Sequence, residues 1–229
     1  MSELIESIKN KIQNQFKDQE GSHDWQHILR VYNMALYLQS VEGGNREVIE
    51  LAALLHDVSD HKYNGGNFDA GWQVAKQVIL DFGATEELAN SVANVVKVVS
   101  FKGALVKDTD TSLEGKIVRD ADRLDAIGAI GIARTFAYGG SKNQAIFLED
   151  VPPVLHVSKE AYFKAKTHTI NHFYEKLLLL TDRMETQTAK EIARERQHFM
   201  LSFLNQYFKE EGFSIEGSAF DLSGFHTSE

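Results

Sequence analysis

Apolar residues recur along most of this chain with the 3.6-residue period of an α-helix. The pattern predicts helices over about residues 3–18, 23–41, 46–58, 68–82, 85–100, 112–127, 129–138, 159–180 and 188–210. One stretch is ambiguous, because Val95-Val96-Lys97-Val98-Val99 is rich in the β-branched residues that favour strands. Its place inside a longer helical pattern favours helix, so the chain is predicted to be all-α.

Capping residues and glycines mark the expected ends of these helices. Ser22, Thr85 and Thr111 stand where N-caps of three helices are expected. The segment 139–157 contains Gly139-Gly140 and both prolines of the chain, which makes it the best candidate for a domain boundary. We therefore expect a main helical domain over residues 1–138 and a C-terminal extension over 139–229, a helical hairpin packed on the same domain.

The composition narrows the class of protein. The chain has 229 residues, 43% of them hydrophobic, which suffices for one sizeable core. Its net charge of -9 and the lack of a basic stripe argue against duplex nucleic acid as a partner. The absence of cysteine excludes thiolate metal sites and disulfides, and it is typical of a reducing compartment.

No targeting or membrane segment is expected. The apolar runs 51–55 and 177–180 are far shorter than the roughly 20 residues of a membrane span. The acidic, amphipathic start of the chain does not resemble a secretory signal. We expect a cytoplasmic protein, whose oligomeric state the sequence does not indicate.

Polar groups on apolar helix faces supply the candidate chemistry. His56-Asp57 ends the apolar run 51–55, and a buried imidazole beside a carboxylate is costly unless both have partners. His27 and Asp122 also lie on largely apolar helix faces. Each of these residues alone could be a satisfied core histidine, a capping aspartate or a salt-bridge partner. Together they make a set of two imidazoles and two carboxylates, which is a ligand set for a divalent metal ion.

Such a ligand set suits phosphoester hydrolysis. Two neutral imidazoles and two carboxylates bring a divalent ion to a formal charge near zero and leave positions for water and an anionic oxygen. The ion lowers the pKa of bound water and polarises a phosphoryl oxygen. Mixed nitrogen and oxygen ligands favour Mn, Fe, Co, Ni or Zn over Ca. We expect one divalent transition metal ion, with Mn favoured and Mg also compatible.

The order His27, His56-Asp57, Asp122 resembles the H…HD…D pattern of the HD superfamily of metal-dependent phosphohydrolases. The local contexts match as well: His-Ile-Leu-Arg-Val begins at the first histidine, Leu-Ala-Ala-Leu-Leu precedes the doublet, and Arg-Leu follows the last aspartate. The resemblance extends over about residues 22–208 and is greatest to a bacterial single-domain branch. It implies an HD-domain helical bundle and makes Asp122, rather than Asp120 or Asp125, the fourth ligand.

The resemblance also bears on residues around these ligands. His23 lies four residues before His27 and could touch metal or substrate, although it lacks a preceding apolar run and fits a capping role as well. Asp24 would favour the positive end of the following helix. Asp125 could orient a ligand histidine. Val99 stands where related chains with a second metal would place histidine, which favours one ion.

Three further residues are candidates for catalysis and substrate binding. Superfamily members often carry an acidic residue three positions after the doublet, and here Asp60 could act as general acid or base or be a solvated turn residue. Lys62 and Arg123 could bind phosphate. Arg123 points about 100° away from the face of Asp122, and a structural ion pair is its alternative role.

We therefore expect a metal-dependent phosphohydrolase that acts on a nucleotide or another small phosphate ester. The resemblance makes nucleoside triphosphate pyrophosphohydrolase activity plausible, and nucleotide monophosphatase activity is the nearest alternative. A weakly active metal- and nucleotide-binding regulatory module and a purely structural helical protein are alternatives from other classes.

Overall fold

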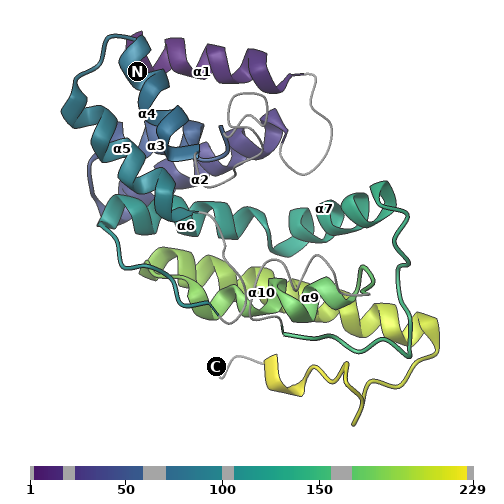
Figure 1. Ribbon diagram of the computed structural model, residues 1–229. Coiled ribbons are helices and arrows are strands. Elements are labelled where there is room, and N and C mark those ends of the chain that lie inside the picture. Colours follow the sequence, from purple (N-terminus) through teal and green to yellow (C-terminus); the bar gives the residue numbers. More distant parts are fainter. Residues whose placement is uncertain (1–2, 18–23, 59–70, 100–105, 156–166, 226–229) are drawn as a thin grey trace. The chain divides into compact units, whose positions relative to one another are not determined.

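The computed structural model describes residues 3–17, 24–58, 71–99, 106–155 and 167–225 (Figure 1). None of these residues lies in a strand, which confirms the all-α prediction. None of the described helices has the length and apolar composition needed to cross a membrane. The α-helices are α1 (Glu3–Phe16), α2 (Trp25–Glu42), α3 (Arg46–Leu55), α4 (Gly71–Asp81), α5 (Glu86–Val99), α6 (Leu113–Asp125), α7 (Gly128–Ser141), α9 (Asn171–Glu175) and α10 (Gln187–Glu211).

The chain divides into two compact units. The first comprises Met1–Phe101 and Asp108–Asp122, and the second comprises Lys102–Lys107 and Arg123–Glu229. The division therefore falls inside α6, earlier in the chain than the boundary near Tyr138 suggested by the loop pattern. Residues 1–138 as a separate domain remain a prediction.

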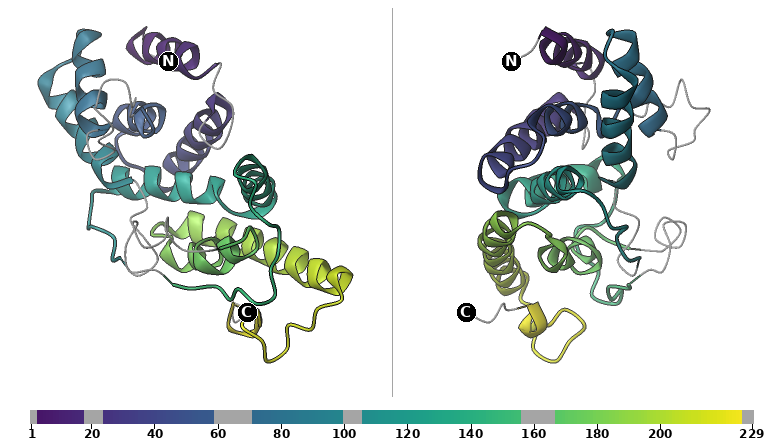
Figure 2. Two further views of the ribbon diagram at one scale, coloured as in Figure 1. Left: turned by 45° about the vertical axis from the view of Figure 1, so that its right-hand side comes forward. Right: turned by 90° about the vertical axis from the view of Figure 1, so that its left-hand side faces the viewer.

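Helix α3 lies at the centre of the first unit. It packs against α1, α2 and α5, and α4 packs on α5 (Figures 1 and 2). All residues of α3 from Val48 to Leu55 are buried. A helix that is apolar on nearly every side must be covered on every side, which explains why this segment occupies the core. His56 follows its C-terminal end into the interior of the unit, and the next residue, Asp57, is partly exposed.

The second unit is built on the long helix α10, against which α7 and the 3-10 turn η3 (Thr181–Arg183) pack. Aromatic rings fill its interior. The ring of Phe147 lies 5.2 Å from those of Phe213 and Phe220 and 5.4 Å from that of Phe208. These edge-to-face contacts attach the loop after α7 to the end of α10 and to the chain beyond it.

The expected helix over about residues 159–180 is wrong for the described part of that segment. Residues 171–175 form the short α9, Lys176 leaves helical geometry at φ -144°, and the 3-10 turns η2 (Leu177–Leu179) and η3 follow. The side chain of Asn171 donates to the Val151 carbonyl, and Glu175 accepts from the Val154 N–H. These tertiary contacts, with burial of most residues around the segment, override the helical pattern, so one arm of the expected hairpin is absent there.

Two of the expected helix caps differ in position. Asp24, not Ser22, is the N-cap of α2, and Ser112, not Thr111, bonds the first turn of α6. Thr85 caps α5 as predicted, through a 3.3 Å bond from the Leu88 N–H to its hydroxyl oxygen. The other helix ends agree with prediction to within a few residues.

Candidate metal centre

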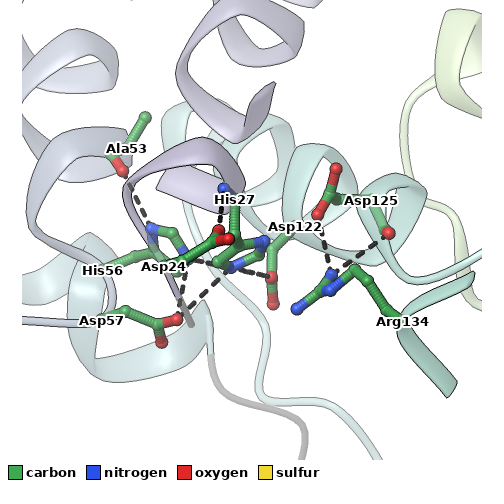
Figure 3. Close-up of polar contacts among 8 residues, drawn as sticks. All are labelled: Asp24, His27, Ala53, His56, Asp57, Asp122, Asp125 and Arg134. Carbon is green, nitrogen blue, oxygen red and sulfur yellow. Dashed lines mark hydrogen bonds and ion pairs between the residues drawn. The ribbon is translucent and has the colours of Figure 1, made fainter. Parts of the chain in front are cut away.

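His27 enters the site from the first turn of α2. The helix begins after Asp24, whose carboxylate accepts the His27 backbone N–H at 2.8 Å. The His27 side chain is buried, because the neighbouring residues Ile28 and Val31 direct this face of the helix into the core. Its Nε2 atom points toward the end of α3 (Figure 3).

His56 and Asp57 follow directly after α3. The Nδ1 atom of His56 lies 2.8 Å from the Ala53 carbonyl oxygen. A carbonyl can only accept a hydrogen bond, so Nδ1 carries the proton and Nε2 of the neutral ring presents a lone pair. Metal-ligating histidines commonly have this second contact, which fixes the tautomer and the orientation of the ring.

The four predicted ligands converge on one point in the first unit (Figure 3). The two imidazole Nε2 atoms are 3.2 Å apart. Oδ2 of Asp57 lies 3.3 Å from Nε2 of His27 and 3.6 Å from that of His56. Oδ1 of Asp122, from α6, lies 3.6 Å and 3.8 Å from the same two nitrogens. Residues more than 90 positions apart in the sequence thus place two carboxylate oxygens near one pair of imidazole nitrogens.

These separations fit a divalent ion. Two donors that each bind one ion at about 2.1 Å lie about 3.0 Å apart for a right angle and about 3.4 Å apart for a tetrahedral angle. The observed distances of 3.2–3.8 Å are close to this range. His27, His56 and Asp57 each offer an atom within 4.8 Å of the others, so these three residues could hold a metal ion.

Exposure differs between the two kinds of ligand. The imidazoles of His27 and His56 are buried, whereas the side chains of Asp57 and Asp122 are 23% and 28% exposed. The nitrogen donors therefore form the inner side of the site, and the carboxylates lie toward solvent. An anionic ligand would approach from the carboxylate side only if a cation offset the two negative charges.

Other predicted residues have different surroundings. Asp125 pairs with Arg134, whose Nη1 donates to its carboxylate at 2.7 Å, and Asp120 is fully buried. Arg123 is 3% exposed and donates to the Arg183 carbonyl at 2.5 Å. This contact favours a structural role for Arg123 over substrate binding. His23, Asp60 and Lys62 lie outside the described residues.

Sequence reasoning did not identify two contacts that support the site. The Ala53 carbonyl that orients His56 belongs to the main chain and carries no sequence signal. The Asp24 bond had a signal, an aspartate three residues before His27, which is the spacing of an N-cap to the backbone N–H that it accepts.

An all-helical fold that gathers two histidines and two aspartates at one point has the architecture and ligand order of an HD domain. The HD domain family model matches residues 24–127, a range that contains all four residues. The Bacillus subtilis protein YpgQ is 38% identical over 214 residues, which cover 92% of this chain and 96% of YpgQ. The chain belongs to the HD superfamily, and at the family level it is an HD-superfamily hydrolase.

Solved structures agree with this assignment. An HD-superfamily hydrolase of Bacillus thuringiensis has a TM-score of 0.71 at 38% identity and covers 92% of this chain and 97% of its own. A protein of Lactobacillus plantarum has a TM-score of 0.80 at 32% identity, and the match covers 93% of this chain and 99% of that protein. YpgQ in complex with ADP has a TM-score of 0.70 at 33% identity, and the match covers 90% of this chain and 94% of YpgQ.

Proposed function

We propose that this protein is a divalent-metal-dependent phosphohydrolase that acts on a nucleotide or a closely related small phosphate ester. The observation that carries the proposal is that Asp57 and Asp122 each place a carboxylate oxygen 3.3–3.8 Å from both Nε2 atoms of His27 and His56, which are themselves 3.2 Å apart. An ion bound there, with Mn²⁺ as the favoured candidate, would lower the pKa of a water molecule and polarise a phosphoryl oxygen.

The chain's own residues supply orientation and charge. The buried imidazoles offer neutral nitrogen donors, and the Ala53 carbonyl keeps the Nε2 lone pair of His56 directed into the site. Asp57 and Asp122 compensate the charge of the cation, and their partial exposure leaves the substrate side open to solvent. Asp60 is proposed as general acid or base, and Lys62 and His23 as substrate-binding groups. For Arg123 that role is disfavoured by its contact with the Arg183 carbonyl.

A nucleotide substrate is supported by the ADP complex of YpgQ. We favour nucleoside triphosphate pyrophosphohydrolysis, which releases a monophosphate and pyrophosphate. Nucleotide monophosphatase activity would release inorganic phosphate from the monophosphate instead. The products therefore distinguish the two reactions.

The test is a substrate screen with Mn²⁺ added to metal-depleted, untagged protein. The panel contains nucleoside mono-, di- and triphosphates and sugar phosphates, and products are separated by anion exchange. We expect Mn²⁺-dependent turnover in the wild type and its loss in Asp57→Asn and His56→Ala. Asp81→Asn and His198→Ala alter exposed residues of the same types and should retain activity.

Each result has a distinct meaning. Turnover that is independent of the metal and of Asp57 would contradict the proposed centre. Nucleotide binding without turnover of any substrate would favour a metal-retaining regulatory module over an enzyme. Absence of both metal binding and nucleotide binding would contradict the proposal altogether.

A further inference from the structure

His27 is the only one of the four site residues that lies in the first turn of a helix. The first N–H groups of a helix have no acceptor within the helix, so a side-chain cap adds to the order of this turn. His56 and Asp57 follow the C-terminal end of the buried α3, and Asp122 lies within α6. The position of the His27 ring therefore depends more than the others on how its helix begins.

Asp24 holds that turn through the backbone of His27 itself. The residue has the extended geometry of an N-cap, with φ -89° and ψ 173°, and its Oδ1 accepts the His27 N–H at 2.8 Å (Figure 3). The carboxylate also lies at the positive end of the helix dipole. A hydrogen bond to an ionised acceptor is shorter and stronger than one to a neutral acceptor.

Other described N-caps of the first unit provide a comparison. Asn45 accepts the Val48 N–H at 3.3 Å and begins α3, and Thr85 accepts the Leu88 N–H at 3.3 Å and begins α5. Both caps have neutral acceptors and longer bonds than Asp24. Neither of the backbone N–H groups that they bind belongs to a site residue.

We infer that Asp24 is a positioning residue for the metal centre, which acts on the ion through the backbone of His27 rather than by contact with it. The inference rests on the proposed function. The bond from Asp24 fixes the first turn of α2 so that Nε2 of His27 stays 3.3 Å from Oδ2 of Asp57 and 3.6 Å from Oδ1 of Asp122. Without the bond the His27 N–H loses its side-chain acceptor, and one nitrogen donor is held in place less firmly.

The test compares Mn²⁺ affinity in matched cap variants of metal-depleted protein, measured by equilibrium dialysis. Loss of a residue that orients a ligand typically costs 10–100-fold in metal affinity, so we expect Asp24→Ala to weaken Mn²⁺ binding by about 10-fold or more. Asp24→Asn keeps a side-chain acceptor and should stay within about threefold of the wild type. Thr85→Ala removes a cap from a helix without a ligand and should bind Mn²⁺ as the wild type does.

A variant that keeps the helix stable separates the loss of the Asp24 hydrogen bond from a failure of the protein to fold. Glycine is nearly as good an N-cap as Asp in stability but offers no side-chain acceptor, so Asp24→Gly should fold and still lose about 10-fold in affinity. Equal Mn²⁺ affinity in Asp24→Gly, Asp24→Ala and Thr85→Ala would overturn the positioning role while leaving the metal centre intact. A wild type that binds no Mn²⁺ would overturn both this inference and the proposed function.

Discussion

The polarity of the proposed metal centre is set by single residues. The His56 Nδ1 proton is directed to the Ala53 carbonyl, which leaves Nε2 as the atom that faces His27 and the carboxylates. The two imidazoles are buried, and the two carboxylates are partly exposed. A neutral inner side and an anionic outer side would hold a divalent cation while keeping its outer face accessible.

At the residue scale, substitutions of Asp60 and Lys62 should change different kinetic constants. Asp60→Asn keeps the shape of the side chain and removes the base, so metal content should persist while the turnover number falls by about 10²–10⁴-fold. Lys62→Ala should mainly raise the Michaelis constant, because it removes a phosphate-binding charge. Both constants and the metal content are measured on the best substrate of the screen. Wild-type turnover in Asp60→Asn would exclude the catalytic role.

The sequence predicted the residues that meet at the site but not all of their surroundings. Two imidazoles and two carboxylates on apolar helix faces are anomalous enough to be found from the pattern, and the structure brings all four together. The Ala53 carbonyl could not be predicted, because a main-chain acceptor is the same in every sequence. The burial of Arg123 could not be predicted either, because its partner is the carbonyl of a residue 60 positions away.

At the scale of elements, buried Arg119 connects α6 to two other segments. Its Nε donates to the Val98 carbonyl near the end of α5 at 3.0 Å, and its Nη2 donates to the Thr109 carbonyl at 2.9 Å. These bonds fix the ends of the connection between the helices. They also hold α6, the helix that carries Asp122, in place against these segments.

Replacement of Arg119 by methionine should therefore destabilise the fold. The carbonyls of half-buried Val98 and exposed Thr109 would lose their donor, and because water can replace the donor at Thr109, the free energy of unfolding should fall by about 1–3 kcal/mol. Urea denaturation measures this change. Arg194→Met, at an exposed position of α10, should change the free energy by no more than about 0.5 kcal/mol. Equal stability of the two variants would contradict the role given to Arg119.

Helices with one apolar face were predictable, and the segment 167–180 was not. The period of apolar residues locates α1 to α6 and α10, because each of them buries an apolar stripe or, like α3 from Val48 to Leu55, nearly all of its surface. The segment 167–180 has a similar apolar period, yet its apolar residues are buried around a short helix and two 3-10 turns. These residues are Ile170, Phe173, Tyr174, Leu177 and Leu178. The contacts of Asn171 and Glu175 with the loop 151–154 decide that geometry, and such contacts are invisible in a local pattern.

At the scale of the whole molecule, metal binding should stabilise the folded state. An ion that binds only the folded chain adds about 2.7 kcal/mol at a concentration 100 times its Kd, or about 5–10 °C in melting temperature. Thermal melts with Mn²⁺ and with chelator measure the shift. Asp57→Ala should show no shift. An equal shift in the wild type and in this variant would indicate that Mn²⁺ stabilises the protein elsewhere.

Two histidines of the second unit should make stability depend on pH. Burial lowers the pKa of His172 to about 3, and it also lowers the pKa of His168, whose Nδ1 accepts the Asn171 N–H. His172 therefore stays neutral in the folded state down to about pH 3, whereas the unfolded chain binds protons below about pH 6.5. The contribution of His172 to stability is complete above pH 6.5 and is lost as the pH falls toward 3, and the lowered pKa of His168 acts in the same direction.

Urea denaturation at pH 7 and pH 5.5 tests this dependence. For a histidine that stays neutral in the folded state, each pH unit below 6.5 should lower the free energy of unfolding by about 1.4 kcal/mol. His172→Asn should reduce the loss between the two pH values by about 1 kcal/mol, whereas His198→Asn, at an exposed position, should not. An unchanged loss in His172→Asn would contradict the assignment.

The metal content of untagged protein, determined by elemental mass spectrometry after dialysis, tests the central claim most directly. We predict one transition metal ion per chain in the wild type and in the exposed control Asp81→Asn. Asp57→Ala and His56→Ala should each lose the ion, because each variant removes a donor from the group of four. A wild type without metal, or stoichiometric metal in both site variants, would contradict the account.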